Sequence, residues 1–111
     1  MTLLDATVRD GSYYVDFKFS SEDVSEIVGR VAKLGFKYIE IGHGKGLNAN
    51  SLKHGLAMQT DEEYMNAAKL VCKESKLGCF CIPEIARLDD IKKATEDSSY
   101  RHELYQTFKI L

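Results

Sequence analysis

Short apolar runs alternate along this chain with longer amphipathic segments, and this alternation limits the folds that the chain can adopt. The apolar runs span residues 3–8, 38–42 and 79–82, and polar residues, glycine or proline close each of them. The segments between them carry apolar residues at helical spacing. Strands that alternate with helices of this length predict parallel strands joined by helical crossovers. The pattern therefore favours an α/β fold.

The residues that begin and end the helices can be identified from their side chains. Ser20 precedes two acidic residues, and Thr60 stands three positions before Glu63, which is the spacing of a capping box. Gly35 is placed to end the first helix, and a third helix is expected to begin near Arg87. The expected inward faces are Val24, Ile27, Val28, Val31 and Leu34 in the first helix, Tyr64, Ala67, Ala68 and Val71 in the second, and Leu88, Ile91 and Ala94 in the third.

Composition and charge argue against several classes of protein. The net charge of -2 and the isoelectric point near 5.9 argue against nucleic-acid binding, which usually brings a basic patch. No run approaches the ~20 apolar residues of a membrane span, and the N-terminus lacks the pattern of a signal peptide. The 3 cysteines, an odd number, fit a reducing compartment, so we expect a cytoplasmic protein. Cys79 and Cys81 lack the second ligand pair of a zinc site, and buried thiols are the preferred interpretation.

Polar side chains follow each predicted strand, where a parallel sheet gathers its functional residues. Arg9 and Asp10 follow the first strand, Glu40 and His43 belong to the end of the second, and Glu84 follows the third. All of them are expected to converge on one mouth of the fold. A surface ion pair at a strand end is the alternative interpretation of the Arg9-Asp10 pair.

The residue types at this mouth suggest separate roles. Asp10 offers a hard oxygen ligand for Mg²⁺ or Mn²⁺, and Arg9 offers a planar fork of donors for a carboxylate or an enolate. Glu40 alternates with two isoleucines, so its side chain should point away from theirs, with Arg9 as its partner. His43 lies between glycines, in a loop that lacks the glycine spacing of a nucleotide-binding fingerprint.

Two motifs resemble those of a known enzyme group. Residues 4–11, Leu-Asp-Ala-Thr-Val-Arg-Asp-Gly, resemble the opening of the metal-dependent pyruvate aldolase and acyl-transferring TIM-barrel superfamily. Residues 39–47, followed by Ser51 and His54-Gly55, look most like 4-hydroxy-2-oxovalerate aldolase. The resemblance runs from about residue 3 to residue 94. It implies the N-terminal three βα units of an incomplete (β/α)₈ TIM barrel over residues 1–94, and a tail over residues 95–111 that is unlike the family.

The resemblance also implies the chemistry. Asp10 would hold a divalent cation, Mn²⁺ or Mg²⁺, and Arg9 would orient pyruvate and stabilise its enolate. Tyr13 stands where the aldolases carry a catalytic histidine, so the implied catalytic set is Arg9, Tyr13, Glu40 and His43, with Arg9 and Asp10 as substrate-binding residues. The family's other metal ligands, a His-x-His pair on a late strand, have no counterpart in this sequence.

The expected function is therefore that of one part of a carbon-carbon lyase. The parent activity is cleavage of a 4-hydroxy-2-oxo acid into pyruvate and an aldehyde, and we expect these 111 residues to be inactive alone. The alternative is a non-catalytic half-barrel that pairs with itself or with a complementing fragment, because a three-unit sheet leaves its edges exposed. The expected partner of the full-length enzyme is a small 2-oxo acid.

Overall fold

The computed structural model describes residues 3–96, and the expected tail over residues 95–111 therefore lies almost entirely outside the described part. The strands are β1 (Leu4–Asp5), β2 (Tyr38–Glu40) and β3 (Lys76–Gly78). The helices are α1 (Thr7–Gly11), a 3-10 helix (Ser12–Val15), α2 (Ser21–Lys33), α3 (Asp61–Val71) and α4 (Leu88–Glu96).

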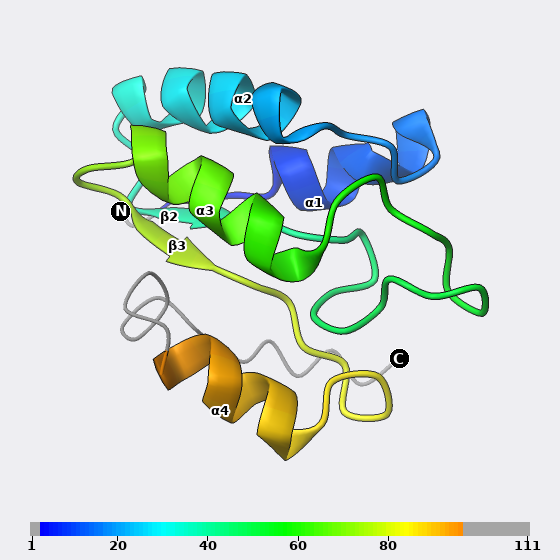
Figure 1. Ribbon diagram of the computed structural model, residues 1–111. Coiled ribbons are helices and arrows are strands. Elements are labelled where there is room, and N and C mark those ends of the chain that lie inside the picture. The colour runs from blue at the N-terminus through cyan, green and yellow to red at the C-terminus, as the bar shows by residue number, and fades with distance from the viewer. Residues whose placement is uncertain (1–2, 97–111) are drawn as a thin grey trace.

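The three strands form one parallel sheet in the order β1-β2-β3. Tyr38 of β2 lies opposite Leu4 on one side and Lys76 on the other, which sets the register of the sheet. Helices α2 and α3 pack side by side against the strands, and α4 lies beyond β3 (Figure 1). The predicted α/β class with a parallel sheet is confirmed, and this arrangement is compatible with part of a TIM barrel.

All three predicted strands have the wrong bounds, although the second differs only at its end, since it was predicted over residues 38–42 and spans Tyr38–Glu40. The first strand, predicted over residues 3–8, ends at Asp5 because the Asp5 carboxylate accepts hydrogen bonds from the backbone N–H and hydroxyl of Thr7, where α1 begins. The third strand, predicted over residues 79–82, pairs over residues 76–78 instead. The Ile41 N–H still donates to the Gly78 carbonyl, but Gly42, with a φ of 104°, then turns the segment after β2 away from the sheet. Residues 79–82 therefore have no strand residues of that segment to pair with.

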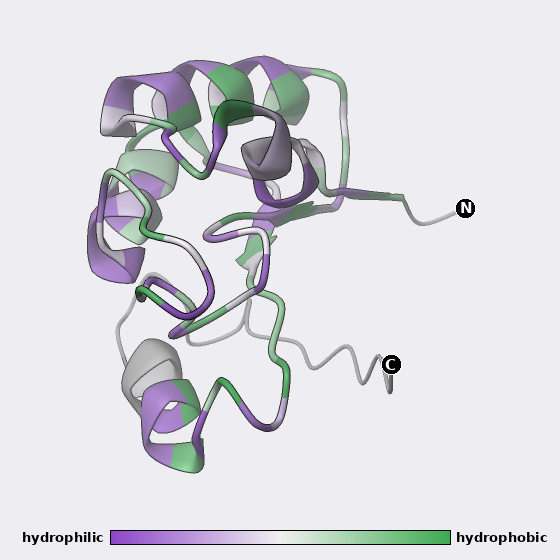
Figure 2. Ribbon diagram, turned by 90° about the vertical axis from the view of Figure 1, so that its right-hand side faces the viewer, coloured by the Kyte–Doolittle hydropathy of each residue, from purple (hydrophilic) through white to green (hydrophobic). Residues whose placement is uncertain are grey.

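Both long helices begin as the sequence predicts. The hydroxyl of Ser20 accepts the N–H of Asp23 at the start of α2, and Thr60 with Glu63 forms the predicted capping box of α3. The buried side chains of α2 and α3 face the strands in the core, and hydrophilic and hydrophobic residues alternate along these helices (Figure 2). The core-facing members of the predicted faces are Val24, Val28, Val31, Tyr64, Ala67 and Ala68, with Ile27, Val71 and Ile91 packed against them.

Two predicted inward residues point outward, and both stand at helix ends. Leu34 is 75% exposed because it is the residue after the last turn of α2. Leu88 is 81% exposed because it is the first residue of α4. The side chain of Ala94, also predicted to face inward, lies outside the described residues.

The loop after β2 passes very close to the chain that extends from β3. The Leu47 N–H donates to the Phe80 carbonyl over 2.8 Å, and Gly46 adopts a φ of 96° beside the same carbonyl. A Cβ on Gly46 would clash with that carbonyl oxygen, and the positive φ would strain any L side chain. Only glycine therefore allows the loop to lie against Phe80.

We expect Gly46→Ala to lower the free energy of unfolding by roughly 2 kcal/mol or more, because both the contact and the φ angle become unfavourable. Gly29→Ala is the matched control, since a Cβ at that helical position would lie 3.7 Å from Val71 Cβ, an ordinary contact. That control should raise stability by about 0.5–1 kcal/mol. Urea unfolding of both variants measures the difference, and a neutral Gly46→Ala would contradict the close approach.

Candidate functional site

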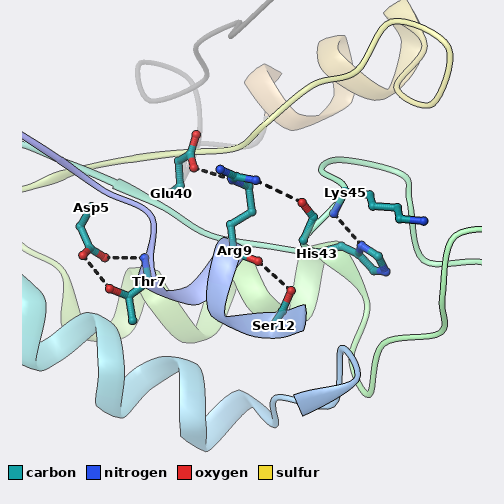
Figure 3. A network of polar contacts seen from close by, with 8 residues as sticks. Asp5, Thr7, Arg9, Ser12, Glu40, His43 and Lys45 are labelled. Carbon is teal, nitrogen blue, oxygen red and sulfur yellow. Dashed lines mark hydrogen bonds and ion pairs between the residues drawn. The ribbon is translucent and has the colours of Figure 1, made fainter. Parts of the chain in front are cut away.

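The first motif of the sequence builds a short helix beneath the site. The Asp5 carboxylate accepts the Thr7 N–H over 3.0 Å and the Thr7 hydroxyl over 2.7 Å (Figure 3). These two bonds turn the chain from β1 into α1. The Ser12 hydroxyl then donates to the Arg9 carbonyl over 2.7 Å. Side-chain hydrogen bonds of the motif therefore fix the backbone both before and after Arg9.

Arg9 and Glu40 form the predicted ion pair across the carboxyl ends of β1 and β2. Arg9 Nε donates to Glu40 Oε2 over 2.5 Å, and the two side chains are 17% and 3% exposed (Figure 3). Arg9 Nη1 also donates to the Gly44 carbonyl over 3.2 Å, and its guanidinium carbon lies 4.6 Å from the centre of the Phe80 ring. Within residues 3–96, Nη2 has no hydrogen-bond partner.

Asp10 does not face its neighbour Arg9. Successive residues of an α-helix diverge by about 100° around its axis, and both lie on α1. Arg9 turns inward toward Glu40, while Asp10 is exposed. Glu84, predicted to share the mouth, is exposed as well. Among the residues that the structure describes, no group of three or more histidine, cysteine, aspartate or glutamate side chains is placed to hold a metal ion.

Tyr13 lies at the rim of the site on the 3-10 helix. Its side chain is 47% exposed, and its ring meets Phe17 edge to face with the centroids 5.2 Å apart. A Cβ on Gly44 would lie 2.7 Å from both the Tyr13 ring and the Ser12 hydroxyl, so the absence of a side chain at Gly44 lets the tyrosine approach. Tyr13 and Arg9 therefore meet at the same glycine from different directions.

His43 is buried, and the backbone already uses both of its ring nitrogens. Nε2 lies 2.9 Å from the Gly55 carbonyl, and Nδ1 accepts the Lys45 N–H over 3.0 Å. The neutral tautomer with its proton on Nε2 satisfies both contacts. The ring also stacks on Phe17 at 4.1 Å and points away from the Arg9 guanidinium (Figure 3). His43 thus ties together the loop that presents Gly44.

Burial is the main reason why the pKa of His43 is lowered in the folded chain. The Gly55 carbonyl and the Asp61 carboxylate oppose this effect, because both favour the protonated ring. Burial also raises the pKa of Asp61, whose carboxylate accepts the Asn48 N–H over 2.9 Å at the start of α3. The hydrogen bond with Cys81 and, after it, burial raise the pKa of the Cys79 thiol, and both thiols are free and buried as predicted.

Two of the groups that hold Arg9 do not stand out in the sequence. Gly44 is one of several glycines in a loop, and Phe80 is an apolar residue between two cysteines. A signal for Phe80 exists in the alternation of its neighbours, because Cys79 and Cys81 belong to the core cluster and Phe80 faces the other way.

In the described part of the chain, no helix is both long and apolar enough to cross a membrane.

We expect Glu40→Gln to lower the free energy of unfolding by roughly 3 kcal/mol, because it leaves the half-buried Arg9 charge without its counter-ion. Glu26→Gln is the matched control, since it breaks an Arg30–Glu26 pair whose side chains are 78% and 66% exposed. That exposed pair should contribute less than about 0.5 kcal/mol. Urea unfolding of both variants compares the two pairs, and equal losses would contradict a special role for Glu40.

We expect stability to fall on acidification through the range in which His43 resists protonation. The unfolded histidine takes up a proton near its ordinary pKa of 6.5, whereas the folded one does so only at lower pH. The free energy of unfolding therefore falls as the pH drops below that value, until the folded pKa is reached. Urea unfolding between pH 7.5 and 5, with an NMR titration of the ring, checks this. His43→Gln should flatten the dependence, and a ring that titrates at or above 6.5 would contradict it.

Comparisons with known proteins find that the sequence of this chain is similar to part of several longer proteins. The chain is 45% identical over 92 residues to an oxaloacetate decarboxylase of Mycobacterium tuberculosis, a match that covers 83% of this chain and 27% of that protein. It is 37% identical over 94 residues to a 4-hydroxy-2-oxovalerate aldolase of Moorella thermoacetica, covering 85% of this chain and 28% of that protein. The aldolase of the same name from Carboxydothermus hydrogenoformans is 36% identical over 94 residues, with the same coverage. No protein-family model matches the chain. The chain thus spans little more than a quarter of the length of these relatives.

Proposed function

This chain belongs to the pyruvate aldolase superfamily that includes 4-hydroxy-2-oxovalerate aldolase, and it matches an N-terminal portion of those proteins. From this membership we propose a function for the chain. It forms the pyruvate-binding part of a divalent-metal-dependent lyase that cleaves a 4-hydroxy-2-oxo acid into pyruvate and an aldehyde. The observation that carries the proposal is the Arg9 guanidinium, which is oriented by Glu40 and Gly44 and whose Nη2 has no hydrogen-bond partner among the described residues.

Arg9 would stabilise the charge that appears during cleavage. When the C4 hydroxyl loses its proton, the C3–C4 bond breaks, the aldehyde leaves, and the bonding electrons form the enolate of pyruvate. That enolate is then protonated at C3. A guanidinium whose orientation is already set can meet the enolate oxygen and the carboxylate with little reorganisation. Loss of carbon dioxide from oxaloacetate yields the same enolate, so the same arrangement also suits a decarboxylase.

The remaining candidate residues take supporting roles in this proposal. Tyr13, half-exposed at the rim, is the candidate to carry a proton to or from the substrate. Glu40 positions Arg9, and His43 positions the loop that carries Gly44. The exposed carboxylate of Asp10 fits one ligand position for Mg²⁺ or Mn²⁺, which would polarise the substrate oxygens when bound. The further ligands would come from beyond residues 3–96.

The state of the cysteines supports a cytoplasmic location for the protein. All three cysteines are free, and neither Cys79 nor Cys81 is exposed, which suits a reducing cytoplasm. The substrate would be a small 2-oxo acid.

The first test of the proposal measures pyruvate binding to the ¹⁵N-labelled chain by NMR. We expect pyruvate to shift the signals of Arg9 and of the residues around Gly44. Arg9→Lys should weaken binding about tenfold or more, because a lysine lacks the planar fork. The exposed Arg30→Lys is the matched control and should bind as the wild type does. If pyruvate shifts no signal of the wild-type chain, the proposed function is wrong for these residues.

Catalysis is tested separately from binding. The chain alone, supplied with Mn²⁺ and 4-hydroxy-2-oxovalerate, should release no pyruvate. Release that depends on the metal and disappears in Asp10→Ala would overturn the proposed inactivity.

A second candidate function is a non-catalytic half-barrel that pairs with a copy of itself or with a complementing fragment. Its support is the sheet order, because β1 and β3 each have a single strand neighbour within residues 3–96. Leu3 and Leu4, at one of these edges, are 51% and 44% exposed. Unpaired strand edges favour association. Sedimentation velocity distinguishes the candidates, and a monomer at micromolar concentration would contradict self-association.

A further inference from the structure

The Phe80 ring differs from the other buried aromatic and aliphatic groups in what it touches. Phe80 is 6% exposed, yet the hydrophobic core cluster includes its neighbours Cys79 and Cys81 and leaves Phe80 out. Its ring lies under the Arg9 guanidinium, 4.6 Å from the guanidinium carbon. A large apolar side chain is therefore buried against a cation.

The contacts of Arg9 restrain its side chain in two different ways. Glu40 and Gly44 bind hydrogen-bond donors that lie in the plane of the guanidinium. Bonds in the plane fix two of its edges, but they leave the plane free to tilt. The Phe80 ring, whose face lies under the guanidinium carbon, restrains the tilt, because the cation is attracted to the electron-rich face of the ring. The three contacts together determine where Nη2 points.

Phe80 is itself held in place by the loop that supplies Gly44. The Phe80 carbonyl accepts the Leu47 N–H over 2.8 Å, and Gly46 lies directly against that carbonyl. The same loop contributes the Gly44 carbonyl that accepts Arg9 Nη1. The ring and the acceptor therefore keep a constant position relative to each other, and both depend on one short segment.

We infer that Phe80 is a positioning residue for Arg9, and that it holds the guanidinium plane so that the Nη2 edge faces the carboxylate of a bound 2-oxo acid. This inference deepens the proposed function and rests on it for the identity of the ligand. The orientation of Arg9 in the free protein is independent of the ligand and is tested by itself.

The test compares Phe80→Leu with Phe80→Tyr by NMR of the arginine side chains in the full chain. Arg9→Lys identifies the Arg9 signals by their loss. In the wild type and in Phe80→Tyr, we expect slow rotation about the Nε–Cζ bond and separate Nη1 and Nη2 signals. In Phe80→Leu, the rotation should accelerate about tenfold or more, and the Nη signals should merge, because a leucine offers no flat face.

The control variant is Phe36→Leu, which makes the same change where Phe36 packs against the core. If loss of stability alone were responsible, this control would free Arg9 as well, and we expect that it does not. Separate Nη signals and an unchanged rotation rate in Phe80→Leu would overturn the inference. Merged Nη signals in the wild-type protein would overturn it too.

Pyruvate titration of the same variants connects the orientation to the ligand. Binding should weaken about tenfold in Phe80→Leu and remain within about twofold in Phe80→Tyr and Phe36→Leu. If the wild type binds no pyruvate while the Nη signals behave as expected, the positioning role stands and the proposed ligand is wrong. If Phe80→Leu frees Arg9 but binds pyruvate like the wild type, the link between the orientation and the ligand is overturned.

Discussion

The ion pair between Arg9 and Glu40 connects the parts of this molecule that are far apart in the sequence. Arg9 stands on a short helix after β1, and Glu40 is the last residue of β2, so the pair joins the carboxyl ends of two neighbouring strands. Such a pair is costly to bury, and its remaining donors must be satisfied or directed at a ligand. The loop after β2 and the chain after β3 meet around it for that reason.

That loop is shaped by glycines and by one histidine. Gly42 and Gly46 adopt backbone angles that L side chains rarely adopt, and Gly44 leaves room for Ser12 and Tyr13. His43 bonds the loop to itself at Lys45 and to the distant Gly55. The histidine would be a poor proton carrier in this state, because the backbone already engages both ring nitrogens. Its contribution is the fixed position of the Gly44 carbonyl beside Arg9.

Much of this arrangement could be predicted from local residue patterns. The capping box at Thr60 and Glu63 and the apolar spacing of α2 are local signals, and both are confirmed. The pairing of Arg9 with Glu40 was also predictable, because a carboxylate that alternates with buried isoleucines needs a nearby cation. The early end of β1 was not predictable, because the hydrogen bonds that Thr7 donates to the Asp5 carboxylate decide it. The exposure of Asp10 was not predictable either, because Asp10 lies on helix α1, which the sequence pattern does not predict. Apolar pattern alone does not reveal a side chain that ends a strand.

The amino-acid sequence by itself determined the α/β class, the alternation of the three strands with α2, α3 and α4, and the ion pair at the mouth of the sheet. These features depend on periodicity, on capping residues and on the cost of burying an unpaired charge, all of which are local or pairwise properties. Only the tertiary structure decided which face of α1 turns inward, that the backbone engages both ring nitrogens of His43, and that the Phe80 ring lies under the Arg9 guanidinium. Arg9 and Glu40 are 31 positions apart in the sequence, and His43 and Gly55 are 12 positions apart. No local pattern specifies the geometry with which such residues meet in space.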